Sequence, residues 1–182
     1  MSIIQTMMDR RSIRAFTDKP VEKEKIEQIM KAAVHAPNAM GAQNWYFAVV
    51  TDPGLLEELR ADLRNAIING PAPPHVKEIA INNPQFNPTH GGKALVICAG
   101  VAASPFSAFD VSMAAQNICL AAKELGLGAC PIGSVKDMGA EMKSKYVPEQ
   151  YTAFFGISIG YPAPVDGSNY KERDMTKVVY FE

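Results

Sequence analysis

The stretch from Asp110 to Leu125 constrains the fold most, because it has the length of a helix and is apolar around nearly its whole circumference. Asp110 opens this predicted helix and Gly126 ends it, since glycine is common just beyond a helix C-terminus. A helix that is apolar on all sides must be buried on all sides. A chain of 182 residues has little room for that, so we expect part of this helix to lie in a subunit interface.

Hydrophobic periodicity predicts further helices and strands around this helix. Ser2 can cap a short helix that carries Ile3, Ile4, Met7 and Met8 on one face. Longer helices are expected over 22–35 and from Pro53, and another begins near Val135. Strands are expected over 46–51, 94–100, 152–160 and 177–181, of which 94–100 is continuously apolar and suits a strand covered on both faces.

The segment 69–92 breaks this regular pattern. It contains five prolines with asparagines and glycines between them, and one short helix is expected inside it, at about 75–81. A long irregular segment in a compact domain is usually a lid, a binding loop or a disordered stretch. Both a lid and a plain surface loop stay open, whereas a domain linker is disfavoured, so we expect one domain over residues 1–182.

Composition excludes several classes of protein. The 18 basic and 19 acidic side chains give a formal net charge of −1, which offers no attraction to nucleic acid or to a membrane surface. No apolar run approaches the roughly 20 residues that span a bilayer, and the N-terminus does not resemble a signal peptide. Three cysteines without CxxC spacing favour a reducing cytoplasm, and three scattered histidines show no metal-ligand spacing.

The stretch 10–14 concentrates three arginines and a serine. In an extended segment, side chains alternate between faces, so Arg10, Ser12 and Arg14 point one way while Arg11 and Ile13 point the other. Two guanidinium groups flanking a hydroxyl suit a phosphate or another anion. The alternative is a solvated basic turn that pairs with surface carboxylates.

Other short patterns favour structural roles. Cys130 could be a nucleophile, but it has no histidine near it in the sequence, and a buried thiol is the preferred interpretation. Gly126-x-Gly128 lacks the third glycine of a dinucleotide-binding fingerprint and follows a helix.

Five short sequence motifs, in their order and spacing along nearly the whole chain, resemble the FMN-dependent nitroreductase family. They are Arg10-Arg11-Ser12-Ile13-Arg14-Ala15-Phe16, then Ala36-Pro37-Asn38 with Gln43-Asn44-Trp45, then residues 126–133, then Gly160-Tyr161-Pro162, and finally Lys171-Glu172-Arg173. The resemblance implies an α+β fold with a mixed, mainly antiparallel sheet flanked by helices. It also implies an intertwined homodimer that holds two FMN molecules at its interface.

The resemblance also implies roles for individual residues. Arg10, Ser12, Lys171 and Arg173 would hold the FMN phosphate, and Arg14 would approach the pyrimidine edge of the flavin. Pro131, Ile132 and Gly133 would lie beside flavin N5. The partner subunit's flavin would be reached by Pro37, Asn38, Ala39 and Gln43. The remaining residues would be Asp110 and Arg11, of which Arg11 faces away and serves structure or the dimer contact. The chain departs from the family's usual pattern at Asn38, Gly41 and Asn44.

The function that this resemblance implies is NAD(P)H-dependent reduction of a small-molecule electron acceptor, such as a nitroaromatic or a quinone. NADH or NADPH would deliver hydride to FMN in a ping-pong mechanism, without a dedicated catalytic side chain or a metal ion. Three alternatives stay open: another flavin reaction (ene reduction, dehydrogenation or dehalogenation), a flavin-binding module without turnover, and a structural dimerisation protein.

Overall fold

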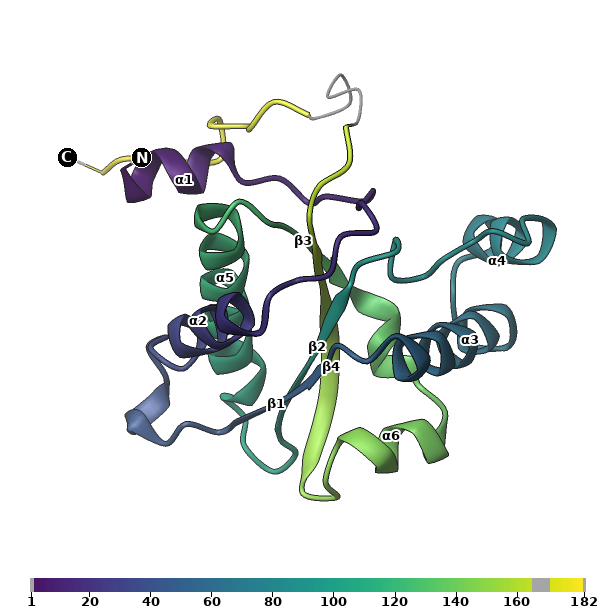
Figure 1. Ribbon diagram of the computed structural model, residues 1–182. Helices are drawn as coiled ribbons and strands as arrows, with labels where there is room; N and C mark the ends of the chain where they lie inside the picture. The colour runs from purple at the N-terminus through teal and green to yellow at the C-terminus, as the bar shows by residue number, and fades with distance from the viewer. Residues whose placement is uncertain (1, 165–170, 182) are drawn as a thin grey trace.

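The computed structural model describes residues 2–164 and 171–181, and its centre is a four-stranded sheet (Figure 1). The strands lie in the order β1-β2-β4-β3, and every neighbouring pair is antiparallel. They are β1 (Trp45–Val50), β2 (Ala94–Val101), β3 (Gly128–Ile132) and β4 (Tyr151–Gly160). One isolated parallel bridge joins Ser12 to Ala129 of β3, and this bridge gives the sheet its mixed character.

The central position of β2 explains its continuously apolar sequence. Residues 94–100 are all buried, because helices cover both faces of the sheet and β1 and β4 flank β2 on either side. This confirms the prediction of a strand covered on both faces.

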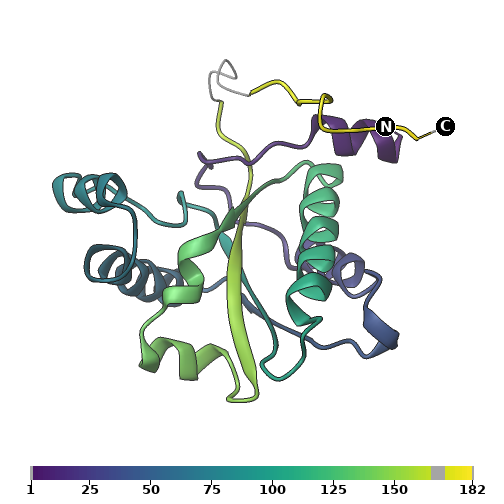
Figure 2. The same ribbon diagram turned by 180° about the vertical axis from the view of Figure 1, so that it is seen from behind.

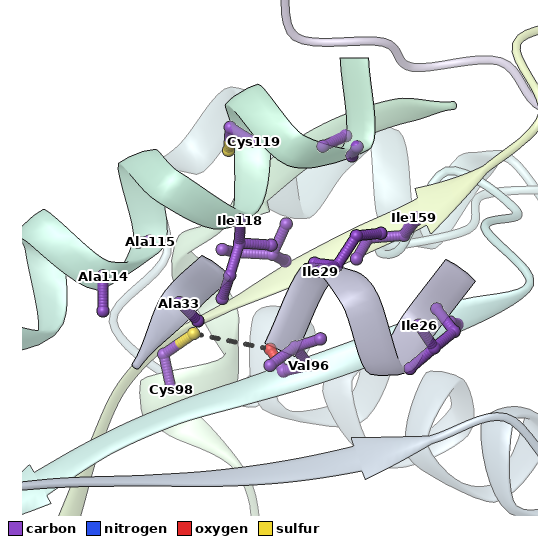
Figure 3. Close-up of a cluster of buried hydrophobic side chains, with 14 of the residues drawn as sticks. Ile26, Ile29, Ala33, Val96, Cys98, Ala114, Ala115, Ile118, Cys119 and Ile159 are labelled. Carbon is purple, nitrogen blue, oxygen red and sulfur yellow. Dashed lines mark hydrogen bonds between the residues drawn. The ribbon is translucent and has the colours of Figure 1, made fainter. Parts of the chain in front are cut away.

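Helices α2 (Lys23–Ala33) and α5 (Ser107–Glu124) cover one face of the sheet. Figure 3 shows how Ile29 of α2 and Ile118 of α5 meet Val96 and Ile159 of the sheet, and none of these four side chains is exposed to solvent. Helix α1 (Ile3–Asp9) lies beside one end of α5, where Thr6 donates a hydrogen bond of 3.0 Å to Glu124.

The opposite face is covered by α3 (Pro53–Asn69), the short 3-10 helix η2 (Gly133–Asp137) and α6 (Ala140–Tyr146), as Figure 2 shows from behind. Helix α4 (Pro74–Asn82) packs against α3 and corresponds to the short helix expected inside the irregular segment. The expected starts of α1 and α3 are confirmed, since the side chains of Ser2 and Asp52 accept hydrogen bonds from the backbone N–H groups of Gln5 and Leu55. None of the helices in residues 2–164 and 171–181 combines the length and the apolar character that crossing a membrane requires.

Three predictions of local structure were wrong. Helix α5 begins at Ser107, so Asp110 does not open the helix but lies within its first turn, where it is buried. Phe109 and Met113 of this helix are exposed in the single chain. The glycine-rich stretch 126–134, for which no strand was expected, contains β3, whose backbone pairs with β4 and whose side chains other than Pro131 are buried.

The third wrong prediction is the C-terminal strand over 177–181. These residues are exposed and take part in no sheet ladder among the described residues. A strand needs a neighbouring extended backbone to pair with, and no strand of the described chain pairs with this segment.

Candidate flavin site

The arginine stretch is fixed against β3 by its backbone. Ser12 forms the parallel bridge with Ala129, and the N–H of Ile13 donates a hydrogen bond of 3.0 Å to the carbonyl oxygen of Ala129. The close approach depends on Gly128, because a Cβ there would lie 2.7 Å from the Cβ of Ile13. The arginine stretch at 10–14 therefore lies against β3, which carries Pro131 and Ile132, although the two segments are far apart along the chain.

Arg10 presents a polar atom without a partner. Its Nε is buried and has no hydrogen-bond partner among the described residues. Arg10, Arg11 and Lys123 line a cavity of about 270 Å³ beside Gly128. An anion with several oxygen atoms would satisfy this donor, because buried polar groups are nearly always hydrogen-bonded. The residues present therefore fit a phosphate group.

Arg11 makes structural hydrogen bonds. Its Nη1 donates to the backbone carbonyl oxygen of Met8 and, over 2.9 Å, to that of Arg10. These bonds satisfy carbonyl groups at the C-terminal end of α1, where a cation also complements the helix dipole. The geometry therefore gives Arg11 a role in shaping the turn that presents Arg10 and Ser12.

Arg14 is exposed, and its positive charge acts on two neighbouring groups. Burial and this charge together lower the pKa of His90. Burial raises the pKa of the Cys130 thiol, although Arg14 opposes this shift. Cys130 is almost fully buried, so its environment favours the neutral thiol and agrees with a structural residue rather than a nucleophile.

The segment from Pro131 to Gly133 borders a cavity of about 490 Å³. Pro131 is exposed on edge strand β3, which tolerates a residue without a backbone N–H. A Cβ placed on Gly133 would meet no atom within 4 Å, so the space over this backbone is open. This volume lies in the range of small-molecule and cofactor sites, and the open backbone suits a planar ring.

The loop between α2 and β1 forms a second group of predicted site residues. It contains the short helix η1 (Ala39–Gly41), and the backbone N–H of Ala39 donates a hydrogen bond of 2.9 Å to Oδ1 of Asp110. The N–H of Gln43 donates one of 2.8 Å to Oδ1 of Asn38, and Pro37 is exposed. Oδ2 of Asp110 is buried without a hydrogen-bond partner among the described residues. Asp110 therefore holds this loop from α5.

The two groups of site residues lie on opposite sides of the sheet. Figures 1 and 2 both place the loop with η1 on the side of α2 and α5, whereas η2, which begins at Gly133, lies on the side of α3 and α6. One chain therefore does not bring residues 37–43 to residues 131–133.

Lys171 and Arg173 follow residues 165–170, which lie outside the described part of the chain. Both side chains are exposed, and neither makes a hydrogen bond or an ion pair with another described residue. Figures 1 and 2 show the C-terminal segment crossing above α1, at the end of the molecule where the arginine stretch begins. The segment 171–181 thus lies at the same end of the molecule as α1, which leads into the arginine stretch.

Sequence reasoning missed His90, which lines the same cavity as Pro131 and Gly133. The sequence offered one indication of this position: His90 lies between Pro88 and the pair Gly91-Gly92, shortly before a buried strand. Within the described chain, no group of three or more His, Cys, Asp or Glu side chains is arranged to hold a metal ion.

Comparisons with known proteins show the family of the chain. Residues 7–161 match the Nitroreductase family. An Archaeoglobus fulgidus protein, provisionally named NADH dehydrogenase/NAD(P)H nitroreductase, is 32% identical over 178 residues, which cover 94% of this chain and 90% of that protein. An FMN reductase (NADPH) of Bacillus subtilis is 27% identical over 200 residues, which cover 98% and 72% of the two chains.

The fold is also that of a solved structure. The crystal structure of a Bacteroides fragilis nitroreductase with bound FMN superposes with a TM-score of 0.90 at 24% identity, and the match covers 100% of both chains.

Proposed function

Because the chain belongs to the Nitroreductase family, we propose that it is an FMN-dependent oxidoreductase that uses NAD(P)H to reduce nitroaromatics, quinones or similar acceptors. The observation that carries this proposal is the backbone pairing of Ser12 with Ala129. This pairing joins a site for an anion, at Arg10, to an open backbone beside a cavity, at Gly133. A cofactor with a phosphate at one end and a planar ring at the other matches this arrangement.

Arg10 and Ser12 hold the phosphate in this proposal. The buried Nε of Arg10 would gain the partner that it lacks among the described residues. The hydroxyl of Ser12 would add a second donor. A phosphate monoester carries close to two negative charges, so Lys171 and Arg173 of the C-terminal segment complete the charge balance. Arg11 shapes the turn through its bonds to the backbone of Met8 and Arg10.

Arg14, Pro131, Ile132 and Gly133 form the surroundings of the ring. When bound, FMN would supply the redox chemistry, a two-electron transfer from NAD(P)H to an acceptor. The fixed positive charge of Arg14 favours negative charge on the pyrimidine edge. A backbone N–H near Gly133 would be available to hydrogen-bond the ring, and a Cβ on Gly133 would meet no atom within 4 Å, so the ring would not be crowded there.

The second group of residues serves the partner subunit in a homodimer. Pro37, Asn38, Ala39 and Gln43 reach the flavin of the partner, and Asp110 fixes their loop through the N–H of Ala39. Exposed apolar side chains on α1 and α5 supply the surface that such a dimer buries, namely Ile3, Ile4, Met7, Met8, Phe106, Phe109 and Met113. An exposed surface of this kind is typical of a protein interface.

Flavin binding is the first experiment. The purified protein should show the visible absorption of bound flavin, and the flavin released on denaturation should be FMN. Arg10→Ala and Arg173→Ala should each weaken FMN binding at least tenfold, because a hydrogen bond to a charged group contributes about 1.5–3 kcal/mol. Lys177→Ala is the matched control, since Lys177 is a cation of the same C-terminal segment but pairs with Asp174.

Turnover is the second experiment. Steady oxidation of NADH or NADPH with menadione or a nitroaromatic supports the oxidoreductase, with parallel lines in double-reciprocal plots for a ping-pong mechanism. Bound FMN without turnover on these acceptors would instead support another flavin reaction or a binding module. A protein that neither contains FMN nor gains thermal stability from it would contradict the proposal.

A further inference from the structure

The cavity beside Gly133 holds one histidine in mostly apolar surroundings. Prolines and other apolar side chains form most of its wall, including Ile67, Pro73, Val76 and Phe86. Two charged residues also line it, Lys136 and Asp137, but they pair with each other over 2.7 Å. The imidazole of His90 makes no hydrogen bond to the rest of the described chain, so its polar atoms are available to a bound molecule.

The loop that carries His90 is held in place from both sides. Arg60 of α3 donates hydrogen bonds of 2.8 Å to the carbonyl oxygen of Gly92 and 3.1 Å to the hydroxyl of Thr89. The buried hydroxyl of Ser158 in β4 donates one of 2.6 Å to the carbonyl oxygen of Thr89. The position of His90 is therefore fixed before any ligand binds, which is what a recognition residue requires.

The backbone at His90 is unfavourable for a residue with a Cβ. Its φ is +56°, in the left-handed region, and the following Gly91 has a φ of +82°. Glycine would fit this turn without strain, whereas a non-glycine residue here costs conformational energy. Backbone conformations of this kind concentrate at functional sites, and Met40 and Gln43 in the loop between α2 and β1 share it.

The charge state of His90 follows from its neighbours. Burial and the nearby positive charge of Arg14 lower its pKa below the usual value of 6.5, and the facing Lys136 and Asp137 balance each other. The imidazole is therefore neutral at pH 7, with one nitrogen as a hydrogen-bond donor and the other as an acceptor.

We propose that His90 binds the electron acceptor by donating a hydrogen bond from its imidazole to a carbonyl or nitro oxygen of that molecule. This inference rests on the proposed function and names a specificity-determining residue for it. In the overall reaction a quinone and NAD(P)H plus one proton yield a hydroquinone and NAD(P)+. His90 orients the oxygen that becomes a hydroxyl, and the proton comes from solvent.

Binding can be tested without turnover by NMR. The chain has three histidines, so the imidazole Cε1–H signals of FMN-loaded protein are few, and the spectrum of His90→Asn identifies the signal of His90. Menadione, added without NAD(P)H, should shift this signal and leave that of exposed His75 unchanged. A His90 signal that stays fixed at menadione concentrations that perturb the flavin absorption would overturn the inference.

Kinetics supply a second test with a matched pair of variants. His90→Gly removes the donor and relieves the backbone, whereas His90→Asn keeps an N–H donor and tolerates a positive φ. The KM for menadione should rise about tenfold in His90→Gly, the equivalent of one hydrogen bond, and return to within about threefold of wild type in His90→Asn.

Ferricyanide is the control acceptor, because it takes electrons without an oriented oxygen contact. Its reduction should not change in either variant. Equal menadione KM values for wild type and His90→Gly would overturn the inference, whereas the proposed function would stand if the enzyme still binds FMN and oxidises NAD(P)H. A protein without FMN binding or NAD(P)H oxidation would overturn both, and the absorption spectrum separates the two failures.

Discussion

Two segments outside the sheet, residues 83–92 and 171–181, differ in the hydrogen bonds that fix them to the rest of the chain. Residues 83–92 are tied to the body of the protein by arginines of α3, since Arg64 donates to the carbonyl oxygens of Ala80, Asn83 and Pro84, while Arg60 reaches Gly92. In residues 171–181 the hydrogen bonds between described residues are local ones, such as that of 2.9 Å from the N–H of Thr176 to Asp174.

The side chains of the two segments differ in the same way. Pro88 and Thr89 are buried by the chain itself. Val179 and Phe181 are 68% and 96% exposed. The first segment therefore completes its folding within one chain, whereas the second carries apolar groups that one chain leaves in water. A second copy of the chain is the partner that our proposal provides, and the following changes test this contrast.

Truncation after Asp174 should have the largest effect, and it should fall on assembly. Burying a side chain such as Val179 or Phe181 contributes about 1.5–3 kcal/mol. Loss of these two residues alone should therefore weaken the dimer about a thousandfold. Sedimentation equilibrium measures the dissociation constant, and Thr176→Ala is the control on the same segment. An unchanged dimer would contradict the view that this segment binds the partner.

Arg60→Leu should have the next largest effect, and it should fall on the stability of the chain. The change removes the bonds to Gly92 and Thr89, and charged hydrogen bonds contribute about 1.5–3 kcal/mol. We expect a loss of about 3 kcal/mol in the free energy of unfolding, measured with urea at fixed protein concentration.

Glu57→Gln is the matched control for this change. Glu57 pairs with Arg60 over 3.2 Å at the surface, and such a pair contributes about 0–1 kcal/mol. Equal losses in the two variants would show that the loop does not depend on Arg60.

Much of the fold could be predicted from the sequence because its signals are local. The apolar run at 94–100 indicated β2, the 3.6-residue period indicated α2, and Pro53 indicated the start of α3. The stretch 128–132 was missed because glycine and proline usually indicate loops, whereas here its pairing with β4 decides the structure. The expected strand at 177–181 failed for the converse reason, since its composition suits a strand that has no neighbour in the described chain.

Only those site residues that belong to a sequence motif could be predicted. The pattern at 10–14 indicated an anion site, and the unpartnered Nε of Arg10 supplies the physical reason. His90 has no such pattern, because its place in the cavity depends on contacts from Arg60 and Ser158, which lie 30 and 68 residues away. Contacts of this range are a property of the folded chain.

Ser158→Ala should have a moderate effect on stability. The serine is fully buried, and removing its hydroxyl leaves the carbonyl oxygen of Thr89 without this bond, at a cost of about 1–2 kcal/mol. Ser144→Ala in α6 removes an exposed bond to the carbonyl oxygen of Glu141 and should change stability by less than about 0.5 kcal/mol. Urea denaturation compares the two, and a similar small change in both would mean that the buried bond adds nothing to the loop.

Substitution of Tyr161 should have the smallest effect on stability. Tyr161 directly follows β4, where the chain turns toward the C-terminal segment. Its hydroxyl donates a hydrogen bond of 2.7 Å to Glu22, and this bond, with smaller effects of neighbouring groups, lowers the pKa of Glu22 from 4.5 to about 2. Because the folded-state pKa is the lower one, the stabilisation is complete above pH 4.5 and is lost as the pH falls toward 2.

Tyr161→Phe should therefore lower the Tm slightly between pH 5 and 7, and its difference from wild type should shrink as the pH falls from 4.5 to 2. Tyr180→Phe, an exposed tyrosine in the C-terminal segment, should give no difference at any pH. Thermal unfolding followed by circular dichroism measures both variants. A Tm difference for Tyr161→Phe that stays constant down to pH 2 would show that Tyr161 acts through packing alone. The hydrogen bond to the Glu22 carboxylate would then not contribute to stability.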